Sequence, residues 1–436
     1  MGKVARDITL QETNECLRAI RDVLSYRGGK IYGFHINIAE SDPEDAVTYL
    51  ADAVGMTPAH MDYTNNVFDW GSWQNAFFIP RPCMLKFDGT VDYYLNPNDY
   101  TKKYGSNAAS DVANVNYGGN AMMEWGRDGK KIWYKIVPDS DPTSASVYIA
   151  NYQADDDFRA WSFVNNQGQY VDHFYTPIYN GSVDGSGRMR SVSGATVSKS
   201  LTAAQEREKC RANNSSLAIW DTEVYCDIIL INFLLTLMSK SLNSQTAFGK
   251  GLTSSGSETV NNGFTTGIHN GKGLFYGTNS GAAGTYTNAV KVFGMENWWG
   301  FQWRRFGGLV NDNGTAKYKM TRGTQDGSSA SDYVISTASA DYAGYLTGGA
   351  VPSVSGNYIS KQTFDRNQCA PSAVAGNSAQ YYCDAFWSNN GQVDYALRGG
   401  FSADSDFCGA WYLYLYASAG AALWPIGSAL SCKPLS

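Results

Sequence analysis

Cysteines and histidines are the residues of this sequence best suited to nucleophilic, redox or metal chemistry, but their spacing supports none of these. The cysteines are scattered and form no Cys-x-x-Cys pair, at Cys16, Cys83, Cys210, Cys226, Cys369, Cys383, Cys408 and Cys432. The histidines form no His-Glu-x-x-His or other ligand spacing, at His35, His60, His173 and His269. In a long chain without secretory context we expect buried free thiols. We expect the histidines to be surface or core residues and not metal ligands.

The motifs of other common enzyme classes are also missing from the sequence. It contains no Gly-x-Ser-x-Gly motif, Walker loop or Gly-x-Gly-x-x-Gly fingerprint. Acidic clusters at residues 155–157 and 41–45 carry the oxygen ligands that calcium prefers, but solvated loops are the simpler interpretation. We therefore predict a protein that is not an enzyme, with no cofactor and no metal site.

Residues 411–416 (WYLYLY) instead suggest a surface that contacts another molecule. Successive side chains of a strand point to opposite faces, so Tyr412, Tyr414 and Tyr416 share one face. The other face is apolar, with Trp411, Leu413 and Leu415. Each tyrosine presents roughly 150–250 Å² of rigid amphipathic surface, and tyrosine is favoured in antibody paratopes because its contacts cost little conformational entropy. The row suits a contact surface or, if the hydroxyls find partners, the core of a sandwich.

The composition of residues 401–425 is unusual for a surface hairpin. The segment contains no Lys, Arg, Glu, Gln, Met or His, and its only charged residues are Asp404 and Asp406. Small residues and aromatics make up most of the rest.

The whole chain limits the possible partners. It has 436 residues with a net charge of −6 and no basic run, so we do not expect it to bind nucleic acid. Its first residues lack a signal peptide's apolar core. The longest apolar run, residues 228–238, falls short of the ~20 residues that cross a bilayer, which predicts a buried helix and no membrane insertion.

The local patterns predict an α+β protein rich in strands and loops. Residues 7–24 carry a short apolar seam typical of an oligomerisation helix or of a helix lying on its own domain. We expect a strand over residues 31–38 and hairpins over residues 84–95 and 121–137. We also expect a short helix over residues 43–54 and a longer helix over residues 221–239. The expected parts are an N-terminal attachment helix (1–30), a smaller β-rich domain (31–137), a linker near 138–144 and a larger domain (138–436).

Two motifs in the larger domain resemble a known family. Residues 293–303 (FGMENWWGFQW) resemble, in altered form, a signature of the formylglycine-generating-enzyme-like branch of the C-type lectin fold. Residues 396–400 (ALRGG), followed by a hairpin and residues 426–430 (IGSAL), resemble the C-terminal ending of that branch. Together with the biased segment, this frame is similar to the variable proteins of diversity-generating retroelements, particularly the receptor-binding proteins of phage tails. The runs 31–35, 45–49, 52–56 and 80–86 are also similar to such tail proteins.

The resemblance implies a C-type-lectin-like domain that displays residues 401–425. In such systems an error-prone reverse transcriptase rewrites adenines of a template, and the resulting codons cannot encode Lys, Glu, Gln, Met or Trp. Trp411 and Trp424 would then be fixed. The implied ligand-binding, variable positions are Phe401, Ala403, Asp404, Asp406, Phe407, Tyr412, Tyr414, Tyr416, Ala417, Gly420, Ala421, Leu423 and Pro425.

The same resemblance implies a place and partners for the protein. It suggests a homotrimer at the tip of a phage or prophage tail, in contact with other tail or baseplate proteins. Its ligand would be a protein or glycan receptor on a bacterial surface. Since the tyrosine row coincides with the implied variable positions, both arguments favour a contact surface there.

Three other functions stay open at this point. One is an oxidase of the formylglycine-generating type, although those enzymes carry paired cysteines soon after their Arg-Gly-Gly motif, and here only Cys408 lies nearby. Another is a lectin that works without calcium, because the Glu-Pro-Asn and Gln-Pro-Asp motifs of calcium-dependent lectins are absent. The third is a structural tail protein of fixed specificity.

Overall fold

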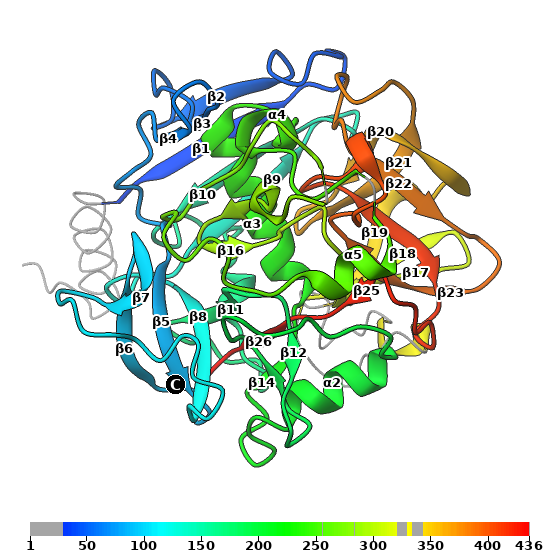
Figure 1. Ribbon diagram of the computed structural model, residues 1–436. Coiled ribbons are helices and arrows are strands. Elements are labelled where there is room, and N and C mark those ends of the chain that lie inside the picture. The colour runs from blue at the N-terminus through cyan, green and yellow to red at the C-terminus, as the bar shows by residue number, and fades with distance from the viewer. Residues whose placement is uncertain (1–28, 255, 283, 321–328, 334–342, 436) are drawn as a thin grey trace, which may run out of the picture.

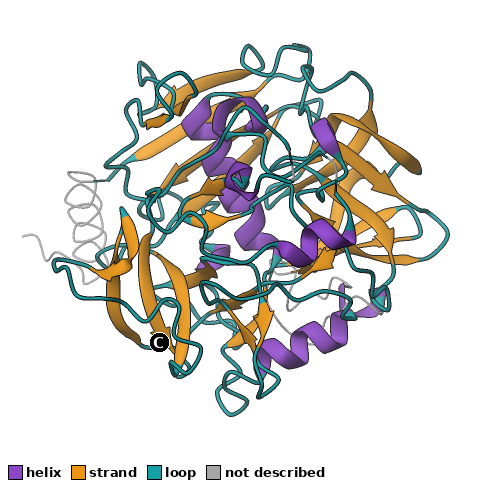
Figure 2. Ribbon diagram, viewed as in Figure 1, coloured by secondary structure: helices purple, strands orange, loops and turns teal. Residues whose placement is uncertain are grey.

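The computed structural model describes residues 29–435, except 255, 283, 321–328 and 334–342. The expected N-terminal seam at residues 7–24 lies outside the described residues. The described chain is mostly β with a few short helices, in several sheets. Figures 1 and 2 show the sheets arranged around one central helix.

The central helix is α3, Tyr225–Ser239, and it is buried along its whole length. Its sequence is apolar on all sides, as expected of a helix enclosed by sheets and not of one lying on a surface. The buried helix predicted here is therefore confirmed. Its expected start at Asp221 is wrong, because residues 220–222 form strand β14 and pair with the C-terminal strand β26. The helix instead begins after Val224.

A four-stranded antiparallel sheet lies at the N-terminal side of the molecule. Its strand order is β2 (Val47–Ala51), β1 (Ile31–Ile36), β10 (Ala145–Ala150) and β9 (Trp133–Pro138). The strand predicted at residue 31 is confirmed, whereas the helix predicted over 43–54 is wrong, because residues 47–51 pair with β1 instead.

A seven-stranded sheet joins the middle of the chain to its C-terminus, which Figure 1 marks beside it. Its order is β14 (Trp220–Thr222), β26 (Leu430–Cys432), β11 (Phe174–Pro177), β8 (Gly119–Trp125), β5 (Arg81–Lys86), β6 (Val91–Asn96) and β7 (Asp99–Lys103). The predicted hairpin at Asp88-Gly89 is confirmed by the pairing of β5 with β6. Gly89 has φ +85°, a conformation that glycine adopts without strain.

The expected hairpin over residues 121–137 is wrong. Its two strands, β8 and β9, belong to different sheets, although a tight turn does form at Asp128-Gly129. The expected linker near 138–144 is the loop between β9 and β10 in the four-stranded sheet. Strands that precede residue 138 and strands that follow residue 144 therefore lie together in both the four-stranded and the seven-stranded sheet.

A nine-stranded sheet forms the C-terminal side of the molecule, coloured yellow to red in Figure 1. Its order is β19 (Ala343–Ala350), β18 (Thr315–Lys319), β17 (Trp303–Asp312), β23 (Val393–Arg398), β24 (Leu413–Ala417), β22 (Ala385–Ser388), β20 (Val354–Phe364) and β21 (Cys369–Val374), with β25 (Ile426–Gly427) pairing β17.

The remaining elements are short. The strand pairs are β3 (His60–Asp62) with β4 (Val67–Asp69), β12 (Ser182–Val183) with β13 (Met189–Arg190), and β15 (Lys291–Val292) with β16 (Met295–Glu296). The helices are α2 (Ala203–Arg211), α4 (Ser244–Phe248) and α5 (Glu258–Gly263), and the 3₁₀ turns are Trp161–Phe163, Tyr286–Asn288, Ala330–Tyr333 and Ser405–Phe407.

A buried ion cluster locks the Arg-Gly-Gly motif to the rest of the frame. Arg398 donates two hydrogen bonds of 2.8 Å to the Glu223 carboxylate and one of 2.7 Å to the carbonyl of Trp298. Arg304 lies 3.7 Å from the same carboxylate, and all three charged side chains are almost fully buried. At Gly399 a Cβ would lie 2.9 Å from the Trp298 carbonyl oxygen, so this close approach requires glycine. The motif is thus part of the structural frame.

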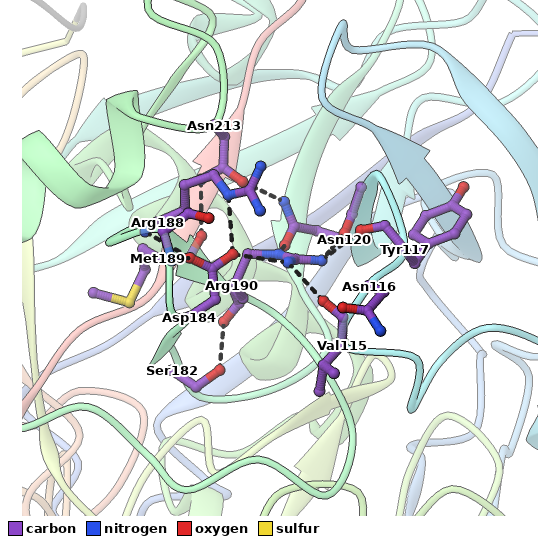
Figure 3. A network of polar contacts seen from close by, with 12 residues as sticks. Val115, Asn116, Tyr117, Asn120, Ser182, Asp184, Arg188, Met189, Arg190 and Asn213 are labelled. Atoms are coloured by element: carbon purple, nitrogen blue, oxygen red, sulfur yellow. Dashed lines mark hydrogen bonds and ion pairs between the residues drawn. The ribbon is translucent and has the colours of Figure 1, made fainter.

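A second polar network, drawn in Figure 3, surrounds the buried Arg190. Its guanidinium donates to the Asn120 and Asp184 side chains at 3.1 and 3.0 Å, and to the carbonyls of Val115, Tyr117 and Gly119. Every N–H of the guanidinium group therefore has a partner within the protein. This arrangement joins β13 to the loop before β8 and serves structure.

Candidate binding surface

The tyrosine row lies on a central strand of the nine-stranded sheet. Strand β24 runs parallel to β22 and antiparallel to β23. Leu413 and Leu415 point inward and join the main core, while Tyr414 is half-buried and Tyr416 is 46% exposed. The alternation predicted for residues 411–416 is confirmed over residues 413–416.

Aromatic rings from several separate segments meet on the outward side of β24, and we call this group the aromatic belt. Tyr412 is buried, Tyr416 is exposed, and the other members are half-buried. The belt consists of Trp303, Tyr358, Trp387, Phe401, Phe407, Tyr412, Tyr414, Tyr416 and Trp424.

The rings of the belt form one continuous series of contacts. From one end to the other, the ring-centroid distances are 4.8 Å for Tyr358–Phe407, 5.3 Å for Phe407–Trp387, 6.1 Å for Trp387–Tyr414, 4.8 Å for Tyr414–Trp303, 4.4 Å for Trp303–Phe401 and 5.9 Å for Phe401–Trp424. Tyr416 extends the series outward, 6.1 Å from Tyr414. Contacts at these distances stabilise aromatic pairs beyond the burial of their area, so the rings hold one another in place before any ligand arrives.

A small apolar cluster supports the middle of the belt. Leu397, Ala417 and Ile426 are buried there, and Trp303 and Tyr414 pack over them. These two rings are therefore held against the protein while part of each remains exposed. A ring fixed in this way loses little conformational entropy when it binds a partner.

Tyr412 departs from the expected solvent-facing row. Only 1% of its surface is exposed, its ring packs against Trp387, and its hydroxyl accepts a 2.8 Å hydrogen bond from the Trp303 indole N–H. Burial raises the pKa of its hydroxyl well above the ordinary value. The cause is local: Tyr412 precedes β24, and its side chain is enclosed by Trp303, Trp387 and Asp404. Tyr412 supports the belt from below and is not itself a contact residue.

Asp404 is the acidic group built into the belt. Its carboxylate accepts hydrogen bonds from the Trp303 indole N–H at 2.8 Å and from the Phe401 backbone N–H at 3.0 Å. Burial raises the pKa of this carboxyl to about 6, although hydrogen bonds, including one with Tyr412, act in the opposite direction. Asp404 therefore fixes the positions of two belt rings.

The remaining implied variable positions divide between surface and interior. Ala403, Gly420 and Leu423 are exposed, and Ala421 is half-buried. Asp406 is half-exposed and forms a 3.2 Å ion pair with Lys250. Two positions are buried and cannot contact a ligand in this conformation, namely Ala417 and Pro425.

Sequence reasoning missed several belt residues because they lie far from the tyrosines in the chain. Trp387 is paired with Tyr414 across β22 and β24, so the two side chains share a face. Trp303 is half-buried at the start of β17, whereas the nearby Trp298 and Trp299 are fully buried. Trp387 did carry a usable signal, since an indole beside buried Phe386 on a strand has to point to the opposite face.

The belt offers ring faces, phenol hydroxyls and few charges, which is the chemistry of a recognition surface. Aromatic residues dominate the energetic centres of protein interfaces. Nucleophilic chemistry has weak support nearby: Cys408 is fully buried and its burial raises the pKa of its thiol well above the ordinary value, which disfavours the reactive thiolate. Cys432, the other cysteine near the C-terminus, belongs to a separate core cluster from Cys408.

Among the described residues, no group of three or more His, Cys, Asp or Glu side chains is arranged to hold a metal ion. No helix in this part of the chain is long and apolar enough to span a bilayer. Comparison with protein-family models and with curated proteins found no match for the chain.

Proposed function

We propose that this protein is a non-enzymatic receptor-binding protein of a phage or prophage tail, and that it attaches to a bacterial surface through the aromatic belt. The single observation that carries the proposal is the belt itself, a continuous series of half-buried rings on a buried frame. Large exposed aromatic patches on soluble proteins mark interaction sites. The tail context rests on the sequence resemblance, which also suggests a C-type-lectin-like domain and a homotrimer.

The arrangement of frame and belt supports a surface whose side chains can change. The inward leucines of β24 belong to the main core, and the Arg398–Glu223 pair fixes the strand beside it. Side chains at Ala403, Tyr416 and Leu423 project outward and contribute little to that core. Substitutions there should alter what the belt binds while costing little stability.

The adhesion test compares two tyrosines on the same sheet. Tyr416, in the belt, and Tyr345, on β19 outside it, are 46% and 40% exposed. We would label the full chain, identify by flow cytometry a bacterial strain that it binds, and then measure Tyr416→Ala and Tyr345→Ala on that strain. The proposal expects a loss of roughly tenfold or more for Tyr416→Ala, as for an interface anchor, and no loss for Tyr345→Ala. Equal binding by both variants would exclude the belt as the adhesive surface.

The oxidase alternative makes the opposite prediction at Cys408. If the protein binds through the belt, Cys408→Ser leaves attachment to the same strain unchanged once folding is verified. Thiol-dependent turnover that disappears in Cys408→Ser would instead establish an enzyme. A calcium-independent lectin would keep the belt as its site and show adhesion that soluble sugars inhibit and chelators do not.

Variation in the segment has its own test. Sequences from sibling isolates should differ mainly between residues 401 and 425, and a near-copy of this coding segment should lie beside a reverse-transcriptase gene. Differences spread evenly over the chain would favour a tail protein of fixed specificity.

A further inference from the structure

A groove far from the belt in sequence has the features of a second binding site. It lies between the β3–β4 hairpin, the β6–β7 turn and the loop over residues 271–276. Two adjoining cavities form it, with volumes of about 280 and 550 Å³, and both are lined by Ile79, Pro97 and Leu274. The larger cavity is within the size range of small-ligand sites.

Aromatic rings form the floor of the larger cavity. The rings of Phe68 and Phe275 are stacked 4.3 Å apart, and the half-buried Trp70 packs against both at 5.1 and 5.2 Å. All three line the cavity. The electron-rich face of an indole attracts the C–H groups on the face of a sugar ring, so Trp70 is the natural stacking platform.

Amide side chains form the rim. Each carries both donors and an acceptor, which suits hydroxyl groups that also donate and accept. They are exposed, and they are Asn66, Gln74, Asn75 and Asn98. An aromatic floor with an amide rim therefore matches the alternating apolar faces and hydroxyl edges of an oligosaccharide.

The charge of the groove is opposite to that of the chain. The net charge of the whole sequence is −6, yet the residues lining the two cavities include Arg81, Arg127 and Lys272 and no Asp or Glu. Arg81 is already bound to Glu124 at 2.6 Å. The Lys272 ammonium lies 4.8 Å from the centre of the Tyr276 ring and has no carboxylate partner among the described residues. Arg127, at the other cavity, lies 3.9 Å from the Asp128 carboxylate, so Lys272 is the cation left available to an anionic ligand.

The loop that carries Lys272 is held in place from beneath. The backbone N–H groups of Gly267 and His269 donate to the buried Glu296 carboxylate at 2.9 and 3.1 Å. The buried Lys291 ammonium donates to the His269 carbonyl at 2.9 Å, and Lys291 and Tyr276 exchange backbone hydrogen bonds. The groove is therefore formed before a ligand binds, which reduces the entropic cost of binding.

We propose that this groove binds a carboxylated oligosaccharide, with a sugar ring stacked on Trp70 and a carboxylate next to Lys272. The site is separate from the aromatic belt and does not depend on the function proposed for the belt. In a protein that attaches to cells, it would provide a second, fixed contact with acidic surface polysaccharide.

The test uses the full chain on a glycan array that pairs each carboxylated oligosaccharide with its neutral methyl ester. The variants are Lys272→Glu and Trp70→Ala, and the controls are Lys361→Glu, an exposed lysine on β20, and Tyr416→Ala in the belt. We expect the wild type to bind at least one carboxylated oligosaccharide roughly tenfold more strongly than its ester, since the charge-assisted hydrogen bond is lost in the ester. Lys272→Glu should abolish this preference and Trp70→Ala should abolish binding, while both controls bind as the wild type does.

Several results would overturn the proposal. These are no binding to any carboxylated oligosaccharide, equal binding of acids and esters, or unchanged binding by Lys272→Glu. Because Lys272 is exposed, its variant stays informative even if Trp70→Ala melts at a lower temperature. Loss of array binding in Tyr416→Ala would assign the sugar to the belt and also overturn the groove. If the groove proves not to bind carboxylated oligosaccharides, the test of the belt by adhesion to a bacterial strain is unaffected.

Discussion

The carboxyl of Asp404 gives the belt a stability that depends on pH, and Asp404→Asn should remove that dependence. The folded-state pKa of about 6 exceeds the ordinary value of 3.8. At about 1.4 kcal/mol for each pKa unit, folding is less favourable with the ionised carboxyl than with the protonated one by up to about 3 kcal/mol. The folded protein holds this proton more tightly than the unfolded chain. The contribution is therefore fully present below about pH 4 and is lost as the pH rises through about 6.

Asparagine keeps an acceptor oxygen for the Trp303 indole but does not titrate. The stability of Asp404→Asn relative to the wild type should thus rise by up to about 3 kcal/mol between about pH 4 and about pH 7.5. Urea denaturation followed by tryptophan fluorescence at several pH values measures this difference, and other carboxyls cancel in the comparison. Asp406→Asn is the matched control, because that carboxyl lies in the same turn but is half-exposed and paired with Lys250. A constant difference across this pH range would refute the argument that Asp404 is buried at its charged end.

Two further predictions concern the frame. Arg398→Ala should lower the free energy of unfolding by about 3–5 kcal/mol, because it leaves the buried Glu223 carboxylate without its main partner. Urea denaturation measures this loss, with Arg127→Ala, a change at an exposed arginine, as the control. Similar losses for the two variants would contradict the prediction. Leu415→Ala should cost about 2–5 kcal/mol as a core truncation, whereas Tyr416→Ala should cost less than about 1 kcal/mol. A larger loss of thermal stability for Tyr416→Ala would mean that the inward and outward faces of β24 are assigned the wrong way round.

Local patterns in the sequence predicted the elements whose causes are local. The alternation of tyrosine and leucine identified the two faces of β24, Asp88-Gly89 identified a hairpin, and a continuous apolar run identified α3. Each depends on side-chain period or on a turn residue within a few positions. Such signals do not require knowledge of distant partners.

The errors arise where distant pairing overrides a local signal. Residues 121–137 have the turn and the strands of a hairpin, but β8 pairs with β5 and β11 while β9 pairs with β10. Residues 47–51 lie in the stretch expected to form a short helix, yet they gain more by pairing with β1 at the sheet edge. Neither outcome can be deduced without knowing which strands lie alongside.

The belt shows why the site itself was only half predictable. Residues 401–425 could be singled out by composition, but Trp303 and Trp387 come from strands β17 and β22, and only the sheet order brings them beside Tyr414. Both indoles lie outside residues 401–425, so under the proposed function they form a constant platform. The platform would supply general affinity for apolar and aromatic surfaces, whereas the outward side chains near Tyr416 would decide which receptor is bound. Specificity could then change between siblings without rebuilding the energetic centre of the interface.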